Sequence, residues 1–182
     1  MSEINEKELI EMLRSEQHKN YAFRLLVHQY QERLYWLVRR IVISHDDAND
    51  LVQDVFIKVF KHIGDFREQS SLYTWIYRIA TNEALRFLRR KRTVLFLPLI
   101  DIQKNLENKL TDDNFFSGDE IEKKLQKAML RLPDKQRLVF QMKYYDHMKY
   151  EEISRILGTS VGALKASYHH AVRKIEAYLD SN

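Results

Sequence analysis

The pattern that most constrains the fold lies near the C-terminus, between Tyr150 and Arg173. Apolar residues recur there at every third or fourth position, which is the spacing of one face of an α-helix. Gly158 interrupts the repeat, and glycine can turn the chain sharply without a steric penalty. Thr159 or Ser160 then stands where a hydroxyl side chain can cap a second helix. The stretch is therefore expected to form a helix, a tight turn and a second helix.

One face of that second helix suits contact with DNA. It carries small side chains first and cations further along, namely Gly162, Lys165, Ala166, His169 and Arg173. Such a face can enter a major groove and hold phosphates at its far end. The alternative is an ordinary helical hairpin with a solvated basic face. The pattern thus predicts a helix-turn-helix and favours DNA binding.

Most of the rest of the chain is also predicted to be helical. Only 4 of its 182 residues are glycine and 2 are proline, while 45% are hydrophobic, as in a globular, helix-rich protein. Apolar periodicity and capping signals predict helices at residues 6–13, 21–42, 44–63, 72–92 and 117–132, with another beginning at Pro133. The sequence therefore predicts an all-α fold of two small helical domains, residues 1–92 and 117–182, joined by an irregular linker at 93–116.

The charges follow this division. Residues 1–92 hold 16 Lys or Arg against 13 Asp or Glu, and residues 117–182 hold 12 against 9, so each domain carries +3. The linker holds 2 against 4 and carries −2. Two basic bodies on an acidic connector are typical of a polyanion binder with two contact points.

Several classes of protein are not expected. No apolar run approaches the roughly 20 residues that span a bilayer, and the polar, acidic N-terminus does not resemble a secretory signal. The chain has no cysteine, which excludes disulfides, thiol catalysis and thiolate zinc sites and fits a cytoplasmic protein.

A metal-dependent nuclease is one alternative, because four aspartates, Asp46, Asp47, Asp50 and Asp54, lie close together in the sequence. The first two are explained by a helix N-terminus, which favours acidic side chains, and the others lie opposite the core stripe. The chain also offers no catalytic grouping of Ser, His and Asp and no glycine-rich phosphate loop. No catalytic residue, metal site or cofactor is therefore expected.

The outward face of the predicted helix at 44–63 has one unusual feature. Ile57 lies there among charged and polar residues, beside Asp50, Gln53 and Asp54. This suggests a protein partner, although single exposed apolar residues are common on protein surfaces.

The predicted helix at 72–92 ends in a basic run of Arg86, Arg89, Arg90, Lys91 and Arg92. Such a run can hold a nucleic-acid backbone by releasing its counterions. Aromatic, hydroxyl and amide groups lie upstream, at Phe66, Arg67, Ser70, Ser71, Arg78 and Asn82. Together these groups are suited to hold unstacked single-stranded bases. The alternative is that the aromatic rings, Trp75 above all, only fill the core.

The two halves together resemble the extracytoplasmic-function (ECF) sigma factors of the sigma-70 family, which have only regions two and four. The resemblance covers almost the whole chain. In region two it rests on DDANDLVQDVFIKVFKHIGDFREQSSLYTWIYRIATNEALRFLRRKR. In region four it rests on LPDKQRLVFQMKYYDHMKYEEISRILGTSVGALKASYHHAVRKIE.

The resemblance implies roles for the candidate residues. The helix bearing Asp50, Gln53, Asp54 and Ile57 would dock on the clamp helices of the largest RNA polymerase subunit. A flipped base of the minus-ten element would be captured, and the adjacent backbone held, by Phe66, Arg67, Ser70, Ser71, Arg78, Asn82, Arg86, Arg89 and Arg90. The recognition helix, from Ser160 to Arg173, would read the minus-thirty-five element.

The resemblance also implies partners. Region four would contact the flap of the second-largest polymerase subunit, and the linker would pass near the active-site cleft. An anti-sigma factor, often anchored in the inner membrane, would hold the protein inactive. A stand-alone dimeric helix-turn-helix regulator is the alternative function, although the sequence offers no dimerisation coiled coil.

The chain departs from the family pattern in its recognition helix. Ala163, Ala166 and Ser167 stand where the family has Thr and Ser-Arg, and His170, Ala171 and Val172 stand where it has Arg-Ala-Arg. More of the affinity is then expected to rest on Lys165, His169, Arg173 and the free amides of the helix N-terminus.

Overall fold

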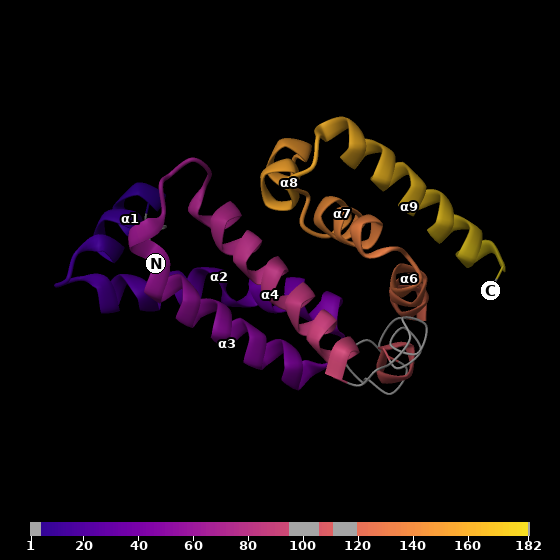
Figure 1. Ribbon diagram of the computed structural model, residues 1–182, viewed down its shortest axis with the longest axis horizontal. Helices are drawn as coiled ribbons and strands as arrows, with labels where there is room; N and C mark the ends of the chain where they lie inside the picture. The colour runs from indigo at the N-terminus through magenta and orange to yellow at the C-terminus, as the bar shows by residue number, and fades with distance from the viewer. Residues whose placement is uncertain (1–4, 95–105, 111–119, 182) are drawn as a thin grey trace.

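The computed structural model describes residues 5–94, 106–110 and 120–181, and all regular structure within these ranges is helical. The elements are α1 (Glu6–Arg14), α2 (Lys19–Val42), α3 (His45–His62), the 3-10 turn η1 (Ile63–Asp65), α4 (Leu72–Val94), α6 (Glu120–Leu130), α7 (Asp134–Tyr144), α8 (Tyr150–Leu157) and α9 (Val161–Ser181). Figure 1 shows them as two groups, α1 to α4 and α6 to α9. The predicted all-α fold of two helical domains is confirmed.

Helices α2, α3 and α4 pack pairwise into a bundle, and α1 packs on α2 and η1. Helix α3 begins where the sequence signal indicated, because the Ser44 hydroxyl accepts the backbone N–H of Asp47 at 3.4 Å. Its inner stripe, including Val55 and Val59, is buried in the bundle, as its periodicity predicted. The bundle leaves the opposite face of α3 in solvent.

The predicted linker is partly helical rather than irregular. Helix α4 continues to Val94, two residues into it, and residues 106–110 are helical as well. Leu106 and Leu110 lie four residues apart, so one helical turn brings both onto the same face. They are buried with Ile43 and Leu130, one residue from each domain. This burial explains why the segment is helical. The other linker residues lie outside the described ranges.

In the second domain, α6 and α7 both pack on the long helix α9. Pro133 directly precedes α7, as predicted, and the free N–H groups of a first turn make proline acceptable there. Gly158 ends α8 with a φ of 61°, in the left-handed region that glycine adopts at little cost. Helix α9 follows at once, so the predicted helix-turn-helix is present.

The two domains share one hydrophobic core. Leu138, Met142 and Ile153 of the second domain belong to the same buried cluster as the bundle of the first. Helix α8 packs directly on α4, as Figure 1 shows. The fully buried Gln141 side chain also donates from Nε2 to the Leu37 carbonyl at 2.9 Å. The chain is therefore folded as one body.

Candidate nucleic-acid interface

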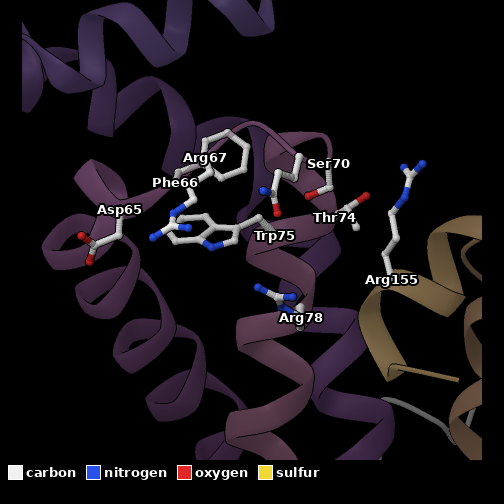
Figure 2. A pocket seen from close by; sticks show the side chains of 9 residues that line it. Asp65, Phe66, Arg67, Ser70, Thr74, Trp75, Arg78 and Arg155 are labelled. Carbon is white, nitrogen blue, oxygen red and sulfur yellow. The ribbon is translucent and has the colours of Figure 1, made fainter.

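A pocket of about 360 Å³ lies between the loop after η1 and the first turns of α4. We call it the loop pocket. It is lined by Asp65, Phe66, Arg67, Gln69, Ser70, Thr74, Trp75, Arg78 and Arg155. Figure 2 shows these side chains around the opening, with Arg155 rising from α8 of the second domain. The structure thus brings together four of the residues that the sequence assigned to unstacked bases, namely Phe66, Arg67, Ser70 and Arg78.

The loop is braced from the N-terminal helix. Arg14 donates to the Phe66 carbonyl at 2.6 Å and pairs with the Glu68 carboxylate at 2.7 Å. A Glu6 carboxylate oxygen accepts the backbone N–H of Leu72 at 3.1 Å, at the first residue of α4. These contacts fix a loop that contains a left-handed residue, Glu68, with a φ of 56°. No local signal in the sequence pointed to Arg14 or Glu6 for this role.

Phe66 and Ser71 hold the loop from within. The Phe66 ring is only 4% exposed and lies 5.2 Å from the Trp75 ring, centroid to centroid, so it forms part of the pocket wall. The Ser71 hydroxyl accepts the backbone N–H of Thr74 at 3.1 Å and caps α4. Arg67 and Arg78 are exposed, and Ser70 is half-buried. In this arrangement the polar side chains, and not the Phe66 ring, are open to a ligand.

An exposed stripe continues from the pocket along α4. Arg78, Asn82, Arg86 and Arg90 are spaced by four residues, so they form one ridge of the helix, and all four are exposed. Exposed Arg89 lies next to the ridge. We call these five residues the α4 stripe. It places an amide and four guanidinium groups on one path that begins at the loop pocket.

Some cations of α4 are engaged with acids of the bundle. Arg86 lies 3.4 Å from the Glu83 carboxylate, which also pairs with Lys58 of α3. Lys91 pairs with Asp47 at 3.1 Å. The cations of these pairs remain open to solvent although the acids are partly buried, so a phosphate can still reach the cations.

The outward face of α3 is open. Asp50, Gln53, Asp54 and Ile57 are all exposed, and the Ile57 side chain is 50% exposed. We call these four residues the α3 face. A cavity of about 530 Å³ between α3 and α4 is lined by residues of both surfaces, including Asp54, Arg86 and Arg90. The α3 face and the α4 stripe therefore meet along one edge of the bundle.

The acidic cluster of α3 forms no metal site. Within the described residues, no group of three or more His, Cys, Asp or Glu side chains is arranged to hold a metal ion. His45 instead bonds the Tyr35 hydroxyl at 2.7 Å and the Asn49 amide at 3.0 Å. No helix in the described ranges is long and apolar enough to cross a membrane.

The helix-turn-helix presents its predicted face to solvent. Ser160 is the cap, since its hydroxyl accepts the backbone N–H of Ala163 at 3.4 Å, whereas the Thr159 hydroxyl donates to the Leu157 carbonyl. Leu164, Ala171 and Ile175 are buried on the other side of α9. The exposed residues, which we call the recognition face, are Ser160, Gly162, Lys165, Ala166, His169 and Arg173.

Comparisons with known proteins identify the family of both domains. Residues 26–94 match the Sigma-70 region 2 family, and residues 122–175 match the Sigma-70 region 4 family. The two regions fall on the bundle and on the helix-turn-helix domain, so the chain is a sigma-70 family protein.

Individual relatives show to which group within the sigma-70 family the chain belongs. The chain is 31% identical to the ECF RNA polymerase sigma-E factor of Haemophilus influenzae, over 96% of this chain and 95% of that protein. It is 30% identical to the ECF sigma factor SigW of Bacillus subtilis, over 84% of this chain and 88% of that protein. The chain belongs to the ECF sigma factors, which direct RNA polymerase to promoters.

Solved structures share the fold. One is CnrH in complex with the cytosolic domain of CnrY, with a TM-score of 0.71 and 23% identity over 97% of this chain and 98% of that one. Another is the sigma factor RpoE in complex with the anti-sigma factor NepR from Bartonella quintana, with a TM-score of 0.67 and 20% identity over 87% and 96%. The two-domain helical arrangement is thus shared with both.

Proposed function

We propose that three surfaces of this sigma factor divide the work of initiation. The α3 face docks on core RNA polymerase, the loop pocket and α4 stripe hold the opened minus-ten element, and the recognition face reads the minus-thirty-five element. The observation that carries the proposal is the α4 stripe, an exposed amide and four guanidinium groups that lead away from a polar pocket. Such a path suits a single strand whose backbone is held by cations while one base enters the pocket.

The proposed mechanism is binding without bond chemistry. Melting costs about 1.4 kcal/mol for each base-pair step, and contacts to the displaced strand offset part of that cost. The two DNA-binding regions each contact little DNA, but joined in one chain on polymerase they act at high effective concentration. We also propose that the protein works in the cytoplasm and that an anti-sigma factor controls it, since two structural neighbours were solved as complexes, with NepR and with CnrY.

Initiation with core RNA polymerase tests the assignment of the α3 face. Ile57→Ser is expected to weaken core binding about fivefold to tenfold. The Ile57 side chain is half-exposed in the free chain, and the substitution removes the apolar contact that it would make with core polymerase in the complex. Ile121→Ser is the matched control, since Ile121 is also exposed but lies on α6 of the other domain. Both variants are compared by fluorescence titration with core enzyme and by mapping transcript 5′ ends on host genomic DNA.

The outcomes are distinct. Selective loss of core binding by Ile57→Ser, with start sites kept by Ile121→Ser, supports the α3 face as the docking surface. Equal affinity of the Ile57→Ser variant and the unsubstituted protein would place the docking surface elsewhere.

A further inference from the structure

Helix α1 holds the start of the loop that forms the loop pocket. We call residues 66–71 the pocket loop. Arg14, the last residue of α1, donates from Nη2 to the Phe66 carbonyl at 2.6 Å and from Nη1 to the Glu68 carboxylate at 2.7 Å. A guanidinium group presents its N–H donors in a rigid, planar fork. One side chain therefore fixes both a backbone group and a side chain of the loop.

The same helix holds the end of the pocket loop. Glu6, its first residue, accepts the Leu72 N–H at 3.1 Å, where α4 begins. The N–H groups of a first helical turn have no partner within their own helix, so Glu6 satisfies one of them. Glu6 and Arg14 are the two ends of a helix of 9 residues, so they lie about 12 Å apart at 1.5 Å per residue. Helix α1, which Figure 1 shows beside η1, thus spans the pocket loop.

Helix α1 is itself anchored in the core of the first domain. Leu9, Ile10 and Leu13 are buried there, and none is more than 3% exposed. The Arg14 and Glu68 side chains, by contrast, are 40% and 46% exposed. An exposed ion pair of this kind adds little to the stability of a fold. Loss of the pair is therefore expected to change the pocket loop and to leave the bundle folded.

The backbone of the pocket loop needs this support. Glu68 has a φ of 56°, in the left-handed region that disfavours residues with a side chain. Such a residue keeps this conformation only where its surroundings hold it, and residues of this kind gather at ligand sites. Arg14 contacts the Glu68 side chain directly and the Phe66 carbonyl two residues earlier. Without Arg14, the loop is expected to leave this conformation more often.

The conformation of the pocket loop determines the shape of the loop pocket. Phe66 is a wall of the pocket and packs on the Trp75 ring. Three other side chains of the loop line the opening, namely Arg67, Gln69 and Ser70. Ordering a loop during binding lowers the affinity for the ligand. A loop that α1 already holds in place therefore binds a ligand more tightly than a loop that is free to move.

We propose that Arg14 and Glu6 are positioning residues for the base that enters the loop pocket, and that α1 holds the pocket loop in the shape that accepts this base. They act through the loop and do not touch DNA. The role of α1 rests on the base capture proposed above for the loop pocket. The affinity for the base falls in proportion to the fraction of molecules whose loop has the accepting shape.

Hydrogen exchange of the free full chain tests whether α1 holds the pocket loop. Arg14→Ala and Glu6→Ala are each expected to speed exchange at residues 66–72 about fivefold, because a loop that has lost the contact at one end opens more often. Glu6→Gln keeps an oxygen that can accept the Leu72 N–H, so it is expected to retain most of the protection. Lys7→Ala, which removes an exposed cation of the same helix, is the matched control and should change nothing.

Binding of single-stranded DNA to the holoenzyme tests whether the loop positions a base. The probes are non-template oligonucleotides from a promoter that the holoenzyme uses, intact or with one minus-ten base at a time replaced by an abasic site. For the unsubstituted protein, one abasic site is expected to weaken binding about tenfold, the effect of losing a stacked base. Arg14→Ala and Glu6→Ala are expected to weaken binding of the intact strand about fivefold and to leave binding of that abasic strand unchanged. Lys7→Ala and Glu8→Ala, at exposed positions of α1, are the matched controls.

The abasic strand separates positioning from charge, because loss of a cation that holds the backbone weakens both strands equally. An equal loss for both strands, or unchanged hydrogen exchange in Arg14→Ala, would overturn the positioning role and leave base capture standing. Absence of any abasic effect with the unsubstituted protein would overturn base capture, and the role of α1 with it. Circular dichroism shows whether each variant is folded, and Glu6→Ala decides the matter if Arg14→Ala is not.

Discussion

Asn82 is the one uncharged residue of the α4 stripe. It lies one helical turn beyond Arg78, which lines the loop pocket. Its exposed amide can both donate and accept hydrogen bonds, so it can recognise the edge of a base that has left the stack. The neighbouring guanidinium groups can hold a backbone and donate to guanine, but they offer no acceptor.

We expect Asn82→Ala to lower open-complex formation roughly tenfold, the effect of losing about 1.4 kcal/mol of base contact. Core binding should not change, because the α3 face lies on another helix. Permanganate reactivity of unpaired thymines on linear promoter DNA, measured beside core affinity, checks both statements. Equal reactivity with the substituted and unsubstituted protein would remove Asn82 from base recognition.

The environment of Asp146 predicts that the stability of the folded protein depends on pH. Burial raises its pKa above the ordinary value of 3.8, although the Tyr77 hydrogen bond, Arg40, Arg33 and His147 act in the opposite direction. The folded protein therefore binds the Asp146 proton more tightly than the unfolded chain. This stabilisation is complete below pH 3.8 and is lost as pH rises through the raised pKa.

The unfolding free energy of the protein minus that of Asp146→Asn should therefore fall as pH rises from about 4, and then level off. The subtraction cancels the other carboxylates, which titrate in both proteins. Urea unfolding across this range measures the difference. A difference that grows with pH would show that the hydrogen bond and the arginines outweigh burial.

At the scale of elements, the helix-turn-helix depends on the backbone of one glycine. Gly158 has a φ of 61°, and a Cβ at this position would meet no atom within 4 Å. Gly162, in the first turn of α9, also has open space where a Cβ would lie, but its φ is the ordinary one of a helix. Neither position would be crowded by a Cβ, and only Gly158 has a left-handed φ, so substitutions at the two glycines isolate the effect of backbone strain.

Gly158→Ala is expected to destabilise the protein by about 1 kcal/mol, because an L-residue is strained in the left-handed region. Gly162→Ala, the matched control, is expected to stabilise it by up to about 1 kcal/mol through helix propensity. Chemical unfolding of the two variants measures the signs. Changes of the same sign would mean that the φ of Gly158 is not the controlling factor.

On the scale of the whole molecule, the shared core makes the two domains one folding unit. Both tryptophans, Trp36 and Trp75, lie in the first domain, whereas helices of both domains contribute to circular dichroism. The unfolding transitions seen by tryptophan fluorescence and by circular dichroism should therefore coincide. The Asp146→Lys substitution should separate them. Separate transitions in the unsubstituted protein would show that the shared core adds little coupling.

Much of the fold could be predicted because it is encoded locally. The cap at Ser44, the turn at Gly158 and the three-to-four spacing along α3 and α9 all act within a few residues of chain. The same reasoning placed the α3 face and the recognition face, which are exposed as expected. It could not show that Phe66 is a wall of the pocket or that residues 106–110 are helical, since both follow from distant packing.

By itself, the sequence determined most of the helices, their order and the two modules of an ECF sigma factor, because each of these depends on neighbours along the chain. Only the tertiary structure decided how the modules dock. The Tyr77–Asp146 hydrogen bond joins residues 69 positions apart, and the Gln141–Leu37 bond joins residues 104 apart. The spacing of residues along a helix cannot predict contacts between such distant positions. They become partners only when the apolar surfaces of the two domains pack together and exclude water.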